Sequence, residues 1–209
     1  HRPSTRTEIE MSLVDILSSQ LGTEGVEKLG QQLGLDPATT QQAVSAAIPM
    51  LTGALAHNAA QPGGADALHQ ALDAHDGSIL DEIGGYLGNS GAASSMGGAI
   101  LGHILGRHQD NATAGLANAT GIDAGQAGQL LSTLAPLVLG ALGRMKQQQG
   151  IDPGDLAGVL QNEHAQAEAA APSGLGGLAQ ILLGGGGSGG GGGLGDIAGS
   201  LLGGLFGGK

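Results

Sequence analysis

The stretch GLDPATTQQAVSAAIPMLTGAL, residues 34–55, decides the fold because the chain uses it twice in altered form. The second copy, GIDAGQAGQLLSTLAPLVLGAL, occupies residues 121–142, and the two copies align without a gap. Three key positions match as the pairs Asp36 and Asp123, Ser45 and Ser132, and Pro49 and Pro136. A unit repeated in this way is usually a packing module that the chain uses twice.

Helical periodicity extends outward from the repeat. Apolar residues recur at helical spacing near the start of the chain, at Leu13, Ile16, Leu17 and Leu21. No stretch sustains the alternation of apolar and polar residues that is typical of a strand. Asp36 before Pro37, and Asp123 three residues before Gln126, are typical helix starts. We therefore predict an all-α, multihelical fold, in which two related helical modules share one core and a glycine-rich C-terminal extension follows.

Each copy of the repeat carries a proline inside a long helical pattern. Proline has no N–H, so Pro49 and Pro136 leave the carbonyls of Ser45 and Ser132 without their usual donors. We expect a kinked or broken long helix in each module. The alternative is that both prolines are tolerated breaks between unrelated short helices.

The rest of the chain divides by composition. Residues 1–10 precede Met11 and are interpreted as an N-terminal extension outside the fold. Residues 11–170 form the predicted helical domain, with modules at about 12–75 and 99–164. Residues 171–193 are predicted to be a linker that combines a short apolar helix with a glycine tract. Residues 194–209 are an apolar tail with glycines spaced by four.

Composition excludes several classes of function. The net charge is −11 with only seven Lys and Arg, and aromatic residues are 1% of the chain. These features argue against nucleic-acid binding and against electrostatic docking to anionic lipid. The absence of cysteine excludes disulfides and thiolate metal sites. The start lacks the pattern of a secretory signal.

Two glycine-spaced segments are candidate interaction surfaces. Small residues spaced by four let helices approach closely, and Gly98, Gly102 and Gly106 have this spacing. The tail combines the same spacing with an apolar stripe that includes Ile197, Leu201, Leu202, Leu205 and Phe206. The stripe favours docking on a partner or self-association. The alternative is a tail that is disordered in isolation, because glycine disfavours helix.

Candidate chemistry is sparse. The acidic cluster Asp73, His75, Asp76, Asp81 and Glu82 is the best candidate metal site. It does not match the calcium-loop pattern, and a solvated loop with a helix cap explains the same residues. The other histidines lack the spacing of a zinc site, and no phosphate-binding or dinucleotide motif is present. We therefore predict no enzyme, no catalytic residues and no cofactor.

Four segments together resemble a known family. They are HDGSILDEIGGYLG at 75–88, GGAILGHILG at 97–106, GIDAGQAGQLLSTLAPLVLGALG at 121–143 and GIDPGDLAGVL at 150–160. They are similar to the YidB-like bacterial family, known as domain of unknown function 937. The resemblance covers about residues 11–165 and, more loosely, the tail. It implies a small multihelical bacterial domain that is cytoplasmic, with no established activity and no functional residues to carry over.

These observations favour a non-enzymatic interaction or scaffold protein that binds a protein partner or a second copy of itself. A membrane-docking protein that uses residues 174–206 is the alternative, although interfacial helices are usually rich in Lys and Arg. A metal-dependent protein that uses residues 73–82 is the lesser alternative.

Overall fold

The computed structural model describes residues 12–170, and this part of the chain is helical without a strand. In chain order the elements are α1 (Leu13–Leu33), α2 (Pro37–Ala59), α3 (Gly64–Ala74), α4 (Ser78–Asp81), α5 (Ile83–Gly88), α6 (Ser90–Leu105), the 3-10 turn η1 (Gly106–His108), α7 (Gln109–Thr120), α8 (Ala124–Gln149) and α9 (Pro153–Ala170). The prediction of an all-α, multihelical fold is confirmed.

The two copies of the repeat adopt the same local structure. α1 leads into α2 and α3, whereas α6 and α7 lead into α8 and α9. The backbone of α1 is interrupted at Gly22, with φ of 52°, and Gly106 ends α6 with φ of 51°. Residues with a side chain rarely adopt this left-handed conformation, so both interruptions favour glycine. A bend before the long helix is thus common to both halves.

Both long helices begin as the sequence predicts. The side chain of Asp36 accepts hydrogen bonds from the backbone N–H groups of Ala38 and Thr39 at the start of α2. Asp123 and Gln126 form a reciprocal capping box at the start of α8. These caps satisfy N–H groups that have no partner within the helix.

The helices do not break at their internal prolines. α2 continues through Pro49 to Ala59, and α8 continues through Pro136 to Gln149. The predicted break is therefore wrong, and whether either helix is kinked at its proline stays a prediction. Both prolines are buried, so the packing around them holds the helix together although one backbone hydrogen bond is lost at each.

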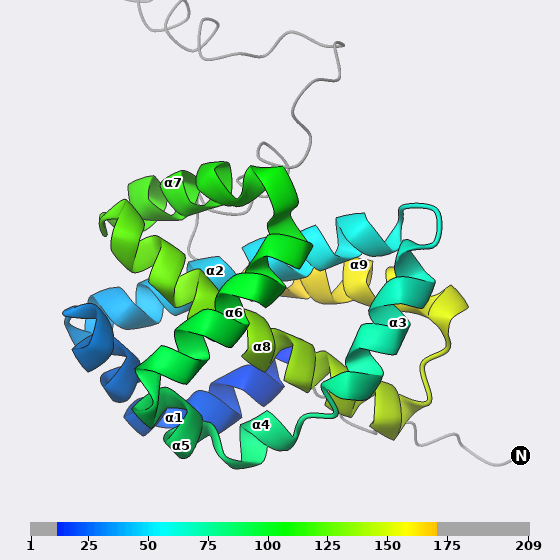
Figure 1. The fold of residues 1–209 in the computed structure, drawn as a ribbon, viewed down its shortest axis with the longest axis horizontal. Helices are drawn as coiled ribbons and strands as arrows, with labels where there is room; N and C mark the ends of the chain where they lie inside the picture. Colours follow the sequence, from blue (N-terminus) through cyan, green and yellow to red (C-terminus); the bar gives the residue numbers. More distant parts are fainter. Residues whose placement is uncertain (1–11, 171–209) are drawn as a thin grey trace, which may run out of the picture.

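The two long helices supply the centre of one hydrophobic core. Nearly all residues from Ala43 to Ala56 of α2 and from Leu130 to Met145 of α8 are buried. α8 packs against α1, α2, α6 and α7, and α2 also packs against α9 (Figure 1). Among residues 12–170, the buried hydrophobic residues form one cluster that runs from Leu13 to Ala167. The described part of the chain therefore packs around one continuous core.

Candidate interaction groove

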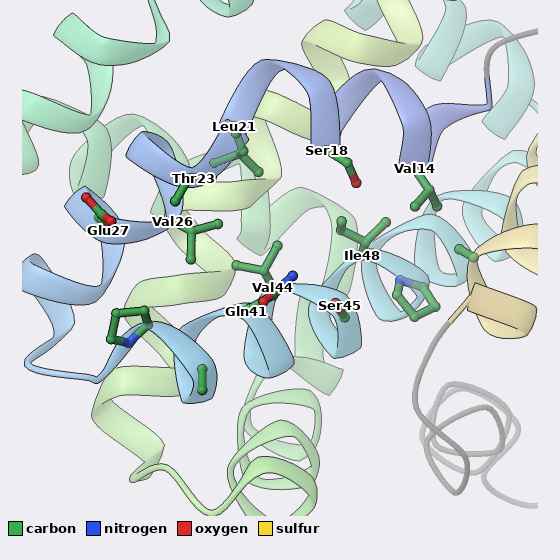
Figure 2. Close-up of a pocket in the computed structure, with 15 residues that line it drawn as sticks. Val14, Ser18, Leu21, Thr23, Val26, Glu27, Gln41, Val44, Ser45 and Ile48 are labelled. Carbon is green, nitrogen blue, oxygen red and sulfur yellow. The ribbon is translucent and has the colours of Figure 1, made fainter.

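A groove of about 530 Å³ lies between α1 and the first half of α2 (Figure 2). Its floor and walls are largely aliphatic, and its rim carries short polar groups. The aliphatic lining includes Val14, Leu21, Val26, Val44 and Ile48, and the polar lining includes Ser18, Thr23, Glu27, Gln41 and Ser45. An apolar surface with a polar rim is a common arrangement in interaction sites.

The bend in α1 shapes this groove. Val14, Ser18 and Leu21 precede the interruption at Gly22, whereas Val26 follows it, and both arms of α1 face α2 in Figure 2. On α2 the lining residues recur every three or four positions from Pro37 to Pro49, so they share one face of that helix. The groove is therefore the space between the bent helix α1 and one face of the long helix α2.

The corresponding face of α8 is in close contact with α5 and α6 near Ser132. Gly97 of α6 packs on the backbone of Ser132, so closely that a Cβ at position 97 would lie 2.6 Å from the Ser132 carbonyl carbon. Tyr86 of α5 donates a hydrogen bond from its hydroxyl to the Thr133 carbonyl oxygen, at 3.2 Å. α5 and α6 thus cover the carbonyls that precede Pro136. In α2 the matching residue, Ser45, lines the groove instead.

α9 closes one end of the groove. His164 Nδ1 donates to the carbonyl oxygen of Pro49 at 3.1 Å, and its ring occupies the space beside Gly53, where a Cβ would lie 2.8 Å from a ring carbon. The carboxylate of Glu163 accepts a hydrogen bond from the backbone N–H of Leu13 at 2.6 Å. Ala167, one turn further along α9, lines the groove. The last described residues of the chain therefore lie at this end of the groove.

The acidic cluster serves to attach the α3–α4 region to α8. Asp73 forms an ion pair with Lys146 at 2.5 Å, and Asp81 forms one with Arg144 at 2.7 Å. The hydrogen bond from Lys146 lowers the pKa of the Asp73 carboxyl below its usual value. Asp76 accepts the backbone N–H of Ser78, which lowers its pKa in the same way.

The lesser alternative, a metal site at residues 73–82, gains no support from this geometry. Among residues 12–170, no three His, Asp or Glu side chains are grouped so that they could hold a metal ion. The carboxylates of Asp73 and Asp81 instead face different basic side chains of α8. Ion pairs account for Asp73 and Asp81, and Asp76 bonds to the backbone N–H of Ser78, the first residue of α4.

A second hollow, of about 780 Å³, lies beside α4 and α5. Its lining includes Asp76, Ile79, Tyr86 and Met96, and Met96 is 53% exposed. Burial of the Tyr86 side chain raises its pKa to about 12. This hollow has a more acidic lining than the α1–α2 groove and lacks a continuous aliphatic wall.

The predicted glycine surface is open in the structure. At Gly98, Gly102 and Gly106, a Cβ would meet no other part of the described chain within 4 Å. The glycine of α6 that allows close packing within the chain is their neighbour Gly97. Whether the open glycines contact a second molecule stays a prediction.

The predicted tail residues Ile197, Leu201, Leu202, Leu205 and Phe206 lie outside the described residues, as does the whole segment 174–206. The membrane-docking alternative therefore stays a prediction. No helix within residues 12–170 is long and apolar enough to cross a membrane. The cytoplasmic location also stays a prediction.

Periodicity alone did not predict the groove. Val44 and Ile48 are themselves buried core residues at helical spacing, so the pattern of apolar residues does not distinguish the groove from the rest of the core. The available signal was the polar set Ser18, Gln41 and Ser45, because these residues interrupt apolar helix faces. That signal becomes useful only when α1 is known to lie over α2.

Comparison with known families identifies one match. The model of a family described as "Bacterial protein of unknown function (DUF937)" matches residues 15–145. This match confirms the YidB-like resemblance that the sequence segments indicate. Neither the curated proteins nor the solved structures gave a match.

Proposed function

Because the chain belongs to this bacterial family of unknown function, we propose its role from the groove: the protein is a non-enzymatic interaction module that binds an apolar helical segment between α1 and α2. One observation carries the proposal. On the long helix of the first module lies a groove of about 530 Å³ that Ser45 lines, whereas in the second module Gly97 of α6 packs on the backbone of Ser132, the residue that matches Ser45.

The dimensions of the groove favour a helical ligand. Its α2 wall runs from Pro37 to Pro49, which corresponds to about 18 Å at the helical rise of roughly 1.5 Å per residue. A ligand helix of about three turns therefore matches the length of this wall. Amphipathic helices bind such grooves through apolar residues that recur every three or four positions.

The chemistry of the lining favours an apolar contact face with little charge. Glu27 is the charged residue of the lining, and it lies in the α1 arm beyond Gly22. Val14, Val26 and Ile48 would contact leucine-like side chains, while Ser18 and Gln41 would contact the polar edge of the ligand helix. Val14 and Val26 are half-buried, and removal of their remaining aliphatic surface from water would favour binding.

The test uses a labelled synthetic peptide of leucine, alanine and glutamine, about 15 residues long, with leucines spaced by three and four. Binding to the chain ended at residue 193, which retains every described residue, is measured by fluorescence anisotropy. We expect saturable binding that is lost in the double variant Ser18→Glu and Gln41→Glu, because the new carboxylates would lie in the groove.

The matched control is the double variant Ser19→Glu and Gln42→Glu. Both residues are exposed neighbours of the groove residues but do not line it, and the change in net charge is the same. The control should bind the peptide as the unmodified chain does. Equal binding by both double variants, or no binding by the unmodified chain, would refute the proposal.

A further inference from the structure

We infer, on the basis of the proposed function, that the groove between α1 and α2 is occupied by the chain's own C-terminal tail, residues 194–206, so that a partner must displace it. The tail would bind as a helix with its apolar stripe against Val14, Val44 and Ile48. The inference rests on where the described chain ends, on the length of the groove and on the pattern of the tail.

The chain leaves the described part of the molecule at the groove. Ala167 lines the groove, and α9 ends three residues later, at Ala170. Glu163 and His164 hold this part of α9 against Leu13 and Pro49. The linker to the tail therefore begins beside the site that the tail would occupy.

The apolar stripe of the tail matches the length of the groove. It runs from Leu194 to Phe206, which is twelve helical steps, as is the α2 wall from Pro37 to Pro49. Both therefore correspond to about 18 Å of helix. The shorter apolar segment that precedes the glycine tract runs only from Leu175 to Leu182, or about 10 Å, and fills little more than half of that length.

The charge of the tail also fits the lining. Between Leu194 and Phe206 its charged residue is Asp196, which lies off the apolar stripe. The opposite side of the predicted helix consists of Gly195, Gly199 and Gly203 together with Ser200. The tail would therefore place aliphatic side chains and Phe206 in the groove and leave its glycines facing solvent.

The linker permits binding within one chain. Residues 171–193 include GGGGSGGGGG at 184–193, and this tract alone is expected to span about 17 Å as a flexible coil. This is close to the length of the groove, and residues 171–183 add to the reach. Such a linker gives an effective concentration on the order of millimolar, so even a weak contact is occupied for most of the time.

The glycines of the tail make this contact reversible. Glycine disfavours helix, so the tail depends on the groove to order it, and part of the binding free energy is used for that ordering. A partner helix with more alanine and leucine would bind the same groove more tightly. The tail would then act as an internal competitor that sets the affinity threshold for partners.

The experiment compares the full chain with the chain ended at residue 193, using the same leucine–alanine–glutamine peptide. We expect the full chain to bind the peptide about tenfold more weakly, because the tail competes at its effective concentration. The variant Leu201→Glu of the full chain should recover the affinity of the shortened chain. The matched variant Ser200→Glu, one position away and off the stripe, should not.

Light scattering on the full chain separates competition within one chain from exchange between copies. A monomer that shows the tenfold weakening supports the inference, whereas weakening that follows a concentration-dependent dimer would assign the tail to a second copy and overturn it. Equal peptide affinity of the full and shortened chains would overturn it too, while leaving the proposed function intact. If the full chain binds phosphatidylcholine vesicles through Leu201 without this competition, the tail is a membrane element instead. If the peptide binds neither chain, the proposed function fails as well.

Discussion

Gly97 and Gly98 of α6 should respond in opposite ways to the same substitution. At Gly97 a Cβ would lie 2.6 Å from the carbonyl carbon of Ser132 and 3.3 Å from its Cα. These are backbone atoms, so a change of rotamer cannot relieve the overlap, and α6 must move away from α8. At Gly98 a Cβ would meet nothing within 4 Å, and the backbone is helical.

The magnitudes follow from these surroundings. Overpacking of this kind costs about 1–3 kcal/mol, and alanine returns about 0.5–1 kcal/mol through its higher helix propensity. We therefore expect Gly97→Ala to lower the free energy of unfolding by about 1 kcal/mol, or Tm by roughly 2–4 °C for a chain of this size. Gly98→Ala should instead raise Tm by about 1–4 °C.

Thermal and urea unfolding followed by far-ultraviolet circular dichroism measure both variants. Gly102→Ala is a second control, because its surroundings are as open as those of Gly98. If Gly97→Ala stabilised the protein as the controls do, the close packing of α6 on α8 would be refuted. The contrast between the close contact at Ser132 and the groove beside Ser45 would then fail with it.

Three further results are expected. Glu163→Ala should lower the free energy of unfolding by about 2–3 kcal/mol in urea titrations, because it removes a charge-assisted hydrogen bond to the buried N–H of Leu13; a change under about 0.5 kcal/mol would contradict this role. Lys146 lowers the folded-state pKa of Asp73, so the stability from this contact is complete above the unfolded-state pKa near 3.8 and is lost as the pH falls through the folded-state pKa. Asp73→Asn should therefore reduce the dependence of Tm on pH below pH 4. If the variant and the unmodified chain lost Tm equally in acid, the contribution of this ion pair would be refuted. Burial raises the pKa of Tyr86 to about 12, so the free energy of unfolding should fall as the pH rises from 10 toward 12. Ultraviolet absorbance follows the ionisation of this single tyrosine directly. A midpoint near 10 in the folded protein would show that the side chain is not buried.

Local rules predicted the elements of this fold well. Asp36 and Asp123 cap the long helices as the sequence indicates, because capping depends on residues three positions apart. The repeat itself predicts that both halves use the same helix order. The prolines were harder to interpret. A proline removes one hydrogen bond whatever its surroundings, but burial among packed helices decides whether the helix continues.

The groove depended on contacts that no local rule describes. Its existence requires α1 to bend at Gly22 and to lie over α2, while α6 lies closer to α8 at Gly97. The sequence shows glycines at all of these positions, and spacing alone favoured Gly98 and Gly102 as the close contacts. Gly97 contacts α8 and its neighbour Gly98 does not, because the rotation of α6 about its axis turns one of them toward α8. The tertiary packing sets this rotation.

The location of the bound peptide tests the central claim most directly. Backbone amide chemical shifts of the isotope-labelled chain ended at residue 193 are recorded with and without the leucine–alanine–glutamine peptide. The account predicts that the largest changes fall on residues 14–27 and 37–49, the two walls of the groove. Changes centred instead on the open face of α6 around Gly98 and Gly102 would contradict it and would place the interaction site on the glycine surface.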